Sequence, residues 1–574
     1  MNAALPGQVK ALTVEVLRDL ALRHPGLERC ASFKRDVKFF RDGTFQMLTE
    51  VMPLEGKYFD SLLARGEESK YAPREPLPRR LFDYWVKGLE THDPSSVLAL
   101  RQMFSLFSKL QVTAAYGDEP FNKFVARNAS VYCPDVDLSL ERRIIGMACC
   151  GIDLLEILPK HGPGAVAGRE RPWEKMRFKK IYKSIDAVYP ICDYFFLNYN
   201  HLSTCLSDLE SFQEEDSPCT RLVAVPKDFR GPRLISAEPK ETQWLQQGQA
   251  RKLMDCIERS PLTRGVVNFS DQEINRQLAM SSSVDGRFVT IDLKDASDRV
   301  AIGHVKKLFL ESLYRCLNAT RSTHTKLPSG EIVELNMFSP MGSAVCFPIE
   351  SLVFYAISLG AILRAEGYRN LRRSCIRAKK YIRVYGDDLI IATEYSEAVM
   401  KRLSEVGFVI NDAKTCTGPY FRESCGCDAY KGVDVTPVRV KSLPDRRNPS
   451  SLPAATDVIN LFGKRHLNTA ASLLETYASE VFGNMPYSTI EGTGAILKRS
   501  RVECFEHNCS CFKSRRNPDL QRFEFLIPRY VSRTHKSDEP AWSEVFRALT
   551  CGPKKDDRYP IPHRGRLTQR WSLL

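Results

Sequence analysis

Four consecutive residues, Tyr385-Gly386-Asp387-Asp388, place the strongest constraint on how this chain can fold. Apolar, strand-forming runs flank them, Tyr381 to Val384 before and Leu389 to Ala392 after. A Gly-Asp corner between such runs is typical of a β-hairpin, with both carboxylates at the turn. Adjacent carboxylates repel each other unless a cation lies between them. The sequence therefore predicts a divalent-metal site here, with an ordinary exposed turn as the alternative for so short a motif.

A second predicted strand also carries an acidic residue near its end. The run Val289 to Leu293 contains Asp292 and leads into a helical pattern between Val305 and Leu317. We expect Ser297 or Asp298 to cap this helix. A core strand followed by a capped helix is a common unit, so this segment alone does not require a catalytic role.

Taken together, the two strand patterns indicate nucleotidyl-transfer chemistry. If the strands are neighbours, Asp292 faces Asp387 and Asp388, and three carboxylates converge. Two Mg2+ ions about 3.5 to 4 Å apart, or Mn2+ in their place, would stabilise the attacking and leaving oxygens of a phosphoryl displacement. We therefore predict Asp292, Asp387 and Asp388 as metal ligands and catalytic residues.

Length and charge agree with a large protein that acts on nucleic acid. A chain of 574 residues exceeds what one core usually holds, so several subdomains are expected. Lys and Arg outnumber Asp and Glu by 83 to 69, a formal charge of +14, which suits a phosphate backbone as partner. Residues 498–574 hold 17 basic and 9 acidic residues, so this end alone carries +8.

No segment predicts secretion or membrane insertion. Val9 to His24 has the pattern of an amphipathic helix interrupted by charges rather than of a signal peptide. The most apolar run, Ser351 to Leu363, has 13 residues, fewer than the roughly 18 to 20 that span a bilayer. We expect a soluble intracellular protein without a membrane partner, and hence reduced cysteines among the 18 present.

One cysteine cluster has metal-ligand residue types. Cys504, His507, Cys509 and Cys511 follow each other within eight positions. This spacing is tighter than that of paired zinc-binding motifs, so zinc is the less favoured interpretation.

A basic segment lies upstream of the acidic residues. Lys227, Arg230 and Arg233 recur every three positions in a stretch rich in Pro and Gly, which is unlikely to be a helix. An extended ribbon of cations suits a nucleoside triphosphate, because Lys and Arg neutralise the charge on the leaving pyrophosphate. An ordinary exposed loop is the alternative.

Between the two acidic elements, a glycine-containing turn precedes a long apolar pattern. Ser339 to Ser343 includes Gly342, and Ala344 to Leu363 predicts a buried helix. Small side chains and free N–H groups at such a turn would suit a nucleotide, so we predict Gly342 and Ser343 as nucleotide-binding residues. Core packing explains most of the helix without any function. Pro348 is expected to kink the helix if it lies inside it.

A lysine follows the predicted hairpin. The apolar run Val406 to Ile410 gives way to Asn411-Asp-Ala-Lys414. Placed beside a departing pyrophosphate, Lys414 could protonate it as a general acid. Most lysines are simply solvated, so this residue alone indicates little.

In chain order, these segments resemble the motifs of RNA-directed RNA polymerases, most closely the replicase subunit of the positive-strand RNA phages (Qbeta-like leviviruses). The matching segments are IDLKDASD for motif A, SPMGSAVCFPIESLVF for motif B, VYGDDLIIA for motif C, NDAKT for motif D, GPYFRESCG with KGVDVTP for motif E, and VPKDFRGPRLISAEP for motif F. They extend from Arg221 to Lys441. An ordered set of this kind is far more specific than any single motif.

The resemblance implies an α+β fold shaped as a right hand. Fingers, a palm built on an antiparallel sheet with helices, and a thumb are expected. The corresponding ranges are 1–285 for the N-terminal region and fingers, 286–445 for the palm, and 446–574 for the thumb and basic C-terminal region. The implied activity is RNA-directed RNA polymerisation that copies a single-stranded RNA genome from ribonucleoside triphosphates without a primer.

The resemblance also implies roles for individual residues. The basic segment would bind the incoming triphosphate, and Lys414 would contact the pyrophosphate. Asp298 and Glu350 fall near positions that sense the ribose in related polymerases. Two departures from the family pattern lie close by: Cys346 stands where Thr is common, and Pro348 has no expected counterpart.

Partners and location follow from the same resemblance. The related subunits work with the host elongation factors Tu and Ts and a ribosomal protein, in the cytoplasm of an infected bacterium. Two rival functions stay open. A reverse transcriptase shares the two-metal chemistry, and a non-enzymatic RNA-binding protein could retain a polymerase-like palm.

Overall fold

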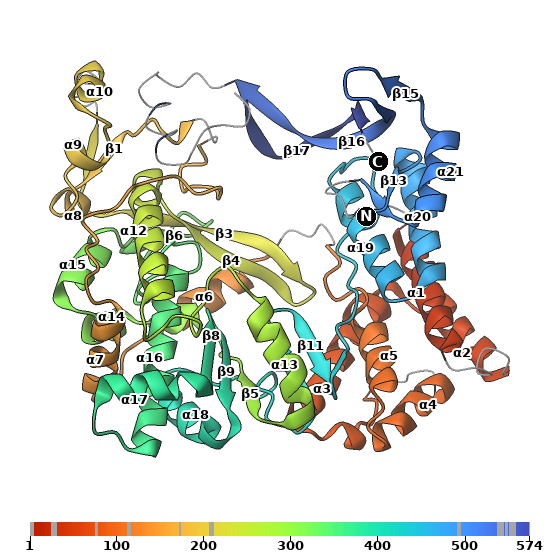
Figure 1. Cartoon of the computed structure of the whole chain (residues 1–574), viewed down its shortest axis with the longest axis horizontal. Coiled ribbons are helices and arrows are strands. Elements are labelled where there is room, and N and C mark those ends of the chain that lie inside the picture. The colour runs from red at the N-terminus through yellow and green to blue at the C-terminus, as the bar shows by residue number, and fades with distance from the viewer. Residues whose placement is uncertain are drawn as a thin grey trace.

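The computed structural model describes residues 5–23, 31–74, 79–111, 116–170, 174–205, 212–490, 495–536, 545, 549 and 558–572. Helices and small, mostly antiparallel sheets occur together along this part of the chain (Figure 1). The expected α+β class is confirmed.

The N-terminal region is helical. Its elements are α1 (Leu5–Leu22), α2 (Ala31–Asp42), the π-helical turn η1 (Met47–Val51), α3 (Met52–Arg65), the 3-10 turn η2 (Glu68–Lys70), α4 (Arg79–Glu90) and α5 (Pro94–Ser105). The helix expected from Val9 to His24 is present as α1. Asp93 caps α5 by accepting hydrogen bonds from the N–H groups of Ser95 and Ser96.

The next region contains the predicted basic ribbon, which is a β-hairpin. Its elements are α6 (Glu119–Ala129), α7 (Ser139–Ala148), β1 (Lys180–Tyr182), α8 (Lys183–Asp186), α9 (Ile191–Tyr194), α10 (Tyr199–Thr204), β2 (Gln213–Glu215), β3 (Cys219–Asp228), β4 (Gly231–Ala237), α12 (Lys240–Arg259) and α13 (Glu273–Asp285). Strands β3 and β4 pair antiparallel, and β6 (His324–Lys326) and β7 (Ile332–Glu334) extend their sheet in the order β4-β3-β6-β7.

A three-stranded antiparallel sheet, called the central sheet below, contains the predicted hairpin. Its strands are β5 (Phe288–Ile291), β8 (Ile382–Tyr385) and β9 (Asp388–Ala392), in the order β5-β9-β8. The helical elements of this region are η4 (Ser297–Arg299), α14 (Ile302–Leu308), α15 (Glu311–Ala319), α16 (Cys346–Glu366), α17 (Leu371–Ala378), η5 (Lys379–Tyr381), η6 (Thr393–Tyr395) and α18 (Ser396–Glu405). The expected hairpin and its neighbouring strand are thus confirmed, with α16 packed against β8 and α18.

The C-terminal region begins with a small sheet and continues as helices. Its elements are β10 (Phe421–Ser424), β11 (Cys427–Tyr430), β12 (Val433–Asp434), α19 (Ser451–Lys464), α20 (Asn468–Phe482), β13 (Tyr487–Ser488), β14 (Leu497–Lys498), α21 (Arg501–Cys511), β15 (Ser514–Asn517), β16 (Arg522–Lys536) and β17 (Arg558–Ser572). In Figure 1, the β16–β17 ribbon extends along the top edge of the view.

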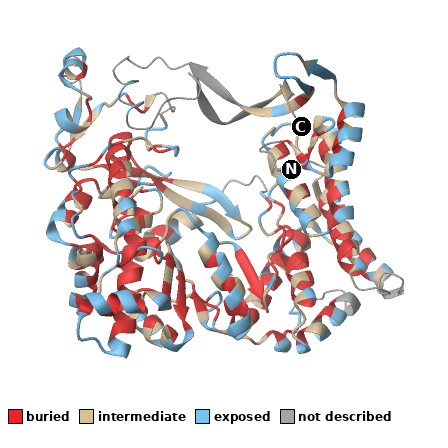
Figure 2. Cartoon of the chain, viewed as in Figure 1, coloured by how far each residue is buried: buried red, intermediate tan, exposed pale blue. Residues whose placement is uncertain are grey.

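Two large apolar cores organise the described residues. One runs from Leu138 to Phe408 and encloses α16 and the central sheet. The other joins residues between Val9 and Leu110 with residues between Cys416 and Leu497, so the two ends of the chain share a core. Figure 2 shows buried residues in the helices and strands around both cores. The domain ranges proposed from the sequence stay predictions, but apolar packing joins the N-terminal helices to the C-terminal region.

Three local features differ from or refine the sequence expectations. Ser297 and Asp298 form the 3-10 turn η4, and the following pattern is divided into α14 and α15, so the expected cap is wrong. The Asp298 carboxylate is instead held by Arg127, at 2.6 Å. Pro348 is the third residue of α16, where its missing N–H has no helical partner to lose, so no kink is required.

Helix α16 is longer than the apolar run read from the sequence. Among the described helices it is the one with the length and composition of a membrane span. However, 94% of that apolar stretch is buried inside the protein. Its composition is therefore accounted for by the core that supports the central sheet.

Candidate active site

Strand register brings the three predicted aspartates to one end of the central sheet. Strands β5 and β9 pair from Phe288↔Ala392 to Ile291↔Leu389, so Asp292 follows directly beside Asp388. Strands β8 and β9 close around the two-residue turn Gly386-Asp387. The sequence prediction that Asp292 lies next to the tandem pair is confirmed.

Gly386 is required by the shape of this turn. Its φ is +63°, the left-handed value that the first central residue of a type II′ hairpin adopts. A β carbon at this position would overlap the ring of Phe347, which comes from the first turn of α16. The Phe347 ring also packs edge-on against Tyr385, with centroids 5.3 Å apart. Helix α16 therefore fixes the turn that carries Asp387.

Polar contacts orient two of the three aspartates. One carboxylate oxygen of Asp292 accepts a hydrogen bond of 2.5 Å from the Asn411 side chain, and the other lies 3.8 Å from the Lys414 ammonium. The Asp388 carboxylate accepts a hydrogen bond of 3.1 Å from the backbone N–H of Cys425. These partners come from the segments that follow the hairpin in the chain.

The carboxylates destabilise one another's charged forms. Burial, and then the charge of Asp387, raises the pKa of Asp388 to about 6. Burial also raises the pKa of Asp292, with Lys414 and Asn411 opposing it. The pKa of Glu350 lies well above its usual value because of burial and of the charges of Asp387 and Asp298. A bound cation would offset this repulsion.

We call Asp292, Asp298, Glu350, Asp387 and Asp388 the acidic cluster. Its donor set, hard carboxylate oxygens, fits Mg2+ or Mn2+. Within the described residues, no three His, Cys, Asp or Glu side chains already converge as a ready metal site. Metal binding at Asp292, Asp387 and Asp388 therefore stays a prediction.

The predicted triphosphate-binding residues lie on the β3–β4 hairpin. Lys227, Arg230 and Arg233 are exposed. Arg230 forms an ion pair with Asp228 at 2.6 Å, and the charge of Asp292 also contributes to the raised pKa of Arg230. The pKa of Lys227 is lowered by partial loss of hydration beside the protein and by repulsion from Arg233 and Arg230. The hairpin thus presents mutually repelling cations in the electrostatic range of the acidic cluster.

Lys414 is 3.8 Å from Asp292 of the acidic cluster and lies in the electrostatic range of Arg230. Its pKa is raised, chiefly by the charge of Glu423 on β10 and further by Asp292. The segment that carries Lys414 is joined to β5 by the isolated bridges Leu293↔Ile410 and Thr290↔Cys416. We call Lys227, Arg230, Arg233 and Lys414 the basic rim.

The glycine turn before α16 packs against β4. Gly342 has a φ of +122°, and a β carbon there would overlap the carbonyl oxygen of Ser236. The N–H of Ser236 donates to the carbonyl of Met341 at 2.8 Å. Ser343 is buried and donates to the Gln246 side chain at 3.0 Å. The turn therefore ties the basic hairpin to α16, and a nucleotide-binding role for Gly342 and Ser343 stays a prediction.

The two predicted ribose-sensing residues both lie in the electrostatic range of Cys346. Asp298 is paired with Arg127, while Glu350 is buried on α16. Burial, and then the charges of Glu350 and Asp298, raises the pKa of the Cys346 thiol. Arg127 was not predicted from the sequence, because no motif marks an arginine 171 positions before Asp298 as its partner.

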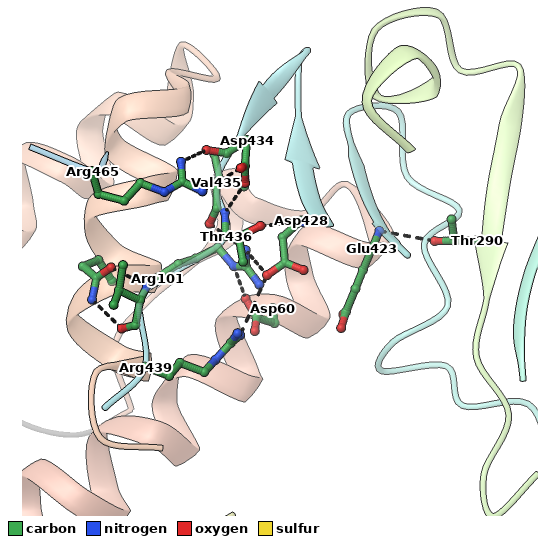
Figure 3. Close-up of polar contacts among 12 residues, drawn as sticks. Asp60, Arg101, Thr290, Glu423, Asp428, Asp434, Val435, Thr436, Arg439 and Arg465 are labelled. Atoms are coloured by element: carbon green, nitrogen blue, oxygen red, sulfur yellow. Dashed lines mark hydrogen bonds and ion pairs between the residues drawn. The ribbon is translucent and has the colours of Figure 1, made fainter. Parts of the chain in front are cut away.

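An ion-pair network joins the N-terminal helices to the sheet of β10 and β11. Figure 3 shows Arg101 of α5 between two carboxylates. It contacts Asp60 of α3 at 2.7 Å and Asp428 of β11 at 2.8 Å. Burial and the charge of Asp428 raise the pKa of Glu423 to about 7. The N-terminal helices thus contact β11, which pairs with the strand that carries Glu423, a contribution that no sequence motif indicated.

The cysteine cluster lies on a single helix remote from this site in sequence. Cys504, His507, Cys509 and Cys511 all belong to α21. His507 stacks on Tyr487, with ring centroids 3.7 Å apart, and its Nε2 contacts the carbonyl of Met485 at 2.8 Å. Packing and hydrogen bonding therefore account for the histidine without a metal.

Comparisons with known proteins single out one family. The model of the family "RNA replicase, beta-chain" matches residues 164–460. The RNA-directed RNA polymerase subunit beta of Qbeta virus (strain MX1) is 34% identical over 227 residues, 39% of this chain and 36% of that protein. The beta chain of Enterobacteria phage fr is 36% identical over 217 residues, 38% of this chain and 37% of that protein. The matched region thus spans just over a third of these relatives' length.

Two solved structures show weaker likeness. The RNA-dependent RNA polymerase of bacteriophage phi12 has a TM-score of 0.40 and 10% identity, covering 76% of this chain and 78% of that one. An insertion-loop deletion mutant of a human picobirnavirus RNA-dependent RNA polymerase has a TM-score of 0.34 and 14% identity, covering 70% of this chain and 84% of that one.

Proposed function

The chain belongs to the RNA replicase beta-chain family, and we propose on that basis that it is an RNA-directed RNA polymerase that copies a single-stranded RNA genome. The observation that carries the proposal is the placement of Asp292 beside Asp387 and Asp388 at one end of the central sheet. A basic rim in its electrostatic range supports a substrate that brings phosphates. The substrates would be an RNA template and ribonucleoside triphosphates.

The proposed chemistry is nucleotidyl transfer. Asp292, Asp387 and Asp388 would hold two Mg2+ ions, which when bound stabilise the charge on the attacking and leaving oxygens. Lys227, Arg230 and Arg233 would bind and orient the triphosphate. Lys414, 3.8 Å from Asp292 and with a raised pKa, would stay protonated near neutral pH and give its proton to the departing pyrophosphate.

Selection of the sugar is proposed for the two residues of the acidic cluster that are not proposed as metal ligands. Asp298 and Glu350 would lie near the ribose, and Gly342 and Ser343 near the nucleotide or template. Because Arg127 already pairs with Asp298, this arginine would keep the carboxylate oriented for a hydroxyl group. Initiation without a primer and cooperation with elongation factors Tu and Ts and a ribosomal protein, in the cytoplasm of an infected bacterium, are proposed from kinship alone.

The direct test is incorporation of labelled rNTPs on a short RNA template with Mg2+, with the host factors added and omitted. Wild type is compared with Asp387→Asn and with Asp255→Asn, an exposed carboxylate on α12 that serves as control. We expect Asp387→Asn to lose synthesis by about 10³-fold or more and to retain template binding. Labelled product that persists in this variant would remove the proposed site.

The same assay separates the rival functions. A reverse transcriptase would incorporate dNTPs in preference to rNTPs. A non-enzymatic RNA-binding protein would give no product with either set, and its RNA retention would be the same in wild type and in Asp387→Asn.

A further inference from the structure

Lys57 of α3 carries a buried ammonium group without a hydrogen-bond partner among the described residues. Its Nζ lies 4.2 Å from the centroid of the Phe229 ring, at the tip of the β3–β4 hairpin. A cation–π contact compensates only part of the lost hydration. An ammonium group has three N–H donors, and leaving all of them unused in a buried place is costly.

Backbone hydrogen bonds anchor the segments that surround Lys57. The carbonyl of Ala64, at the end of α3, accepts hydrogen bonds from the N–H groups of Thr417 at 3.0 Å and Gly418 at 2.8 Å. The segment that follows Lys414 is therefore anchored to α3. At the other side, the N–H of Phe229 donates to the carbonyl of Ser108 at 3.2 Å, which anchors the hairpin tip to the N-terminal region.

The charges around Lys57 are mostly of its own sign. Burial, and then repulsion from Arg230, Lys414 and Lys227, lowers the pKa of Lys57 to about 8. Asp228 is the nearby carboxylate, but Arg230 already binds it at 2.6 Å. The positive potential at this point is therefore not neutralised by the described protein groups, and an anion would neutralise it.

Lys175 is a second buried lysine, and its contacts are those of a structural residue. Lys175 donates to the carbonyl of Gly162 at 2.9 Å and to that of Gly164 at 2.5 Å. Its charge is satisfied by the protein itself. Lys57 has no such acceptors, so packing alone does not explain an ammonium group there; an uncharged side chain of equal length would fill the space at lower cost.

We infer that Lys57 is a further phosphate-binding residue of this site. It belongs to the N-terminal region, outside residues 164–460 that match the family, and acts beside the basic rim. Its ammonium group donates to non-bridging oxygens of the incoming triphosphate and of the departing pyrophosphate, beside Lys227, Arg230 and Lys414. The inference rests on the proposed function, since it assigns Lys57 to the same substrate. An RNA backbone phosphate offers the same chemistry, and the experiment separates the two sources.

The experiment compares three full-length proteins, each with the same host factors: wild type, Lys57→Met, and Lys87→Met as a control at an exposed lysine on α4. Single-nucleotide incorporation on an RNA template gives KM and kcat for the rNTP. Calorimetry with Mg2+ and inorganic pyrophosphate gives a binding constant that does not depend on synthesis. Fluorescence anisotropy with a labelled RNA gives the template affinity.

We expect Lys57→Met to raise the KM for rNTP and the Kd for pyrophosphate by about tenfold or more, since one charge-assisted contact is lost. The template affinity should stay within about twofold of wild type, as should all constants of Lys87→Met. The melting temperature should not fall, because a desolvated charge in a positive field has been removed.

Three outcomes overturn the inference. Unchanged KM and pyrophosphate affinity in Lys57→Met would remove any phosphate-binding role. Weaker template binding with unchanged rNTP and pyrophosphate constants would assign the ammonium group to the RNA backbone. A lower melting temperature with unchanged constants would assign it to folding. If wild type makes no RNA, the proposed function fails, while the pyrophosphate titration still decides the role of Lys57.

Discussion

The acidic cluster and the basic rim differ in how the chain assembles them. The central carboxylates are placed by strand register, because Asp292 follows β5 and Asp387 and Asp388 form the turn into β9. The cations come from a separate hairpin and from the segment around Lys414, and the hairpin tip is docked on the N-terminal region. One half of the site is built by local pairing and the other by long-range packing.

The electrostatic consequences are opposite and complementary. In the acidic cluster, burial and repulsion raise the pKa of Asp388 and Glu350. In the basic rim and beside it, lost hydration and repulsion lower the pKa of Lys227 and Lys57. Each side lacks the charge that a metal-bound triphosphate would bring to it, so the free protein holds both sides at a cost in stability.

The largest effect is expected when the acidic cluster loses a ligand. Asp292→Asn should reduce rNTP incorporation by about 10³-fold or more, because a shared metal ligand is lost. The melting temperature without metal should stay equal or rise, since one repelling charge is removed. Thermal melts with and without Mg2+ check this: a Mg2+-dependent rise in wild type that persists in full in the variant would contradict a metal role for Asp292.

A smaller loss is expected at the basic rim. Lys414→Arg keeps the positive charge beside Asp292 but gives up its proton far less readily, so the rate should fall by about 10- to 100-fold with little change in KM. Presteady-state incorporation at saturating rNTP measures the rate. A variant that loses affinity for rNTP and keeps its rate would show that Lys414 binds the substrate without acting as the acid.

What could be predicted from the sequence also separates into features set by local patterns and features set by long-range packing. The tandem aspartates, the neighbouring strand and the extended basic ribbon were predictable, because strand period and turn chemistry are local signals. The pairing of Arg127 with Asp298 and the position of Lys57 over Phe229 were not, because each joins segments more than 150 positions apart. The helix cap was misassigned because α14 begins only at Ile302, after the 3-10 turn that contains Ser297 and Asp298.

The turn itself offers a steric test of the acidic cluster. Gly386→Ala should destabilise the fold by about 1 to 3 kcal/mol, because of the positive φ at this position and the overlap with Phe347. Incorporation should fall about tenfold as Asp387 is displaced. Combining the change with Phe347→Ala should recover the steric part of the loss in incorporation. If the double variant is no more active than Gly386→Ala, the overlap is not what displaces the carboxylate.

The smallest effect is expected where the basic hairpin meets α12. Glu238, just after β4, is buried, and it accepts hydrogen bonds from Gln246 at 3.2 Å and Ser322 at 2.5 Å. Gln246 also accepts from Ser343, so this carboxyl group helps to position the glycine turn. Burial raises the pKa of Glu238 from 4.5 to about 7.

Because the pKa of Glu238 is raised, the protein loses stability as the pH rises. Since the folded-state pKa exceeds the unfolded one, the group's contribution to stability is fully present below pH 4.5 and is lost as pH rises through about 7. Glu238→Gln should therefore be more stable than wild type at pH 8, by about 1 to 2 kcal/mol, and no more stable at pH 4.5. Denaturant melts at both pH values, with the exposed Glu331→Gln as control, measure the difference.

Repeating the denaturant melts with Mg2+ compares Glu238 with the buried carboxyl groups of the acidic cluster. Glu238 is held by neutral donors and has no cation to gain, so Mg2+ should leave the difference between wild type and Glu238→Gln unchanged at both pH values. At the acidic cluster, Mg2+ should stabilise wild type more at pH 8 than at pH 4.5, because only ionised carboxylates bind it well. The opposite result has two parts: Mg2+ removes the stability difference between wild type and Glu238→Gln, and Asp292→Asn does not change how much Mg2+ stabilises the protein. A raised carboxyl pKa in this chain would then not indicate a cation site.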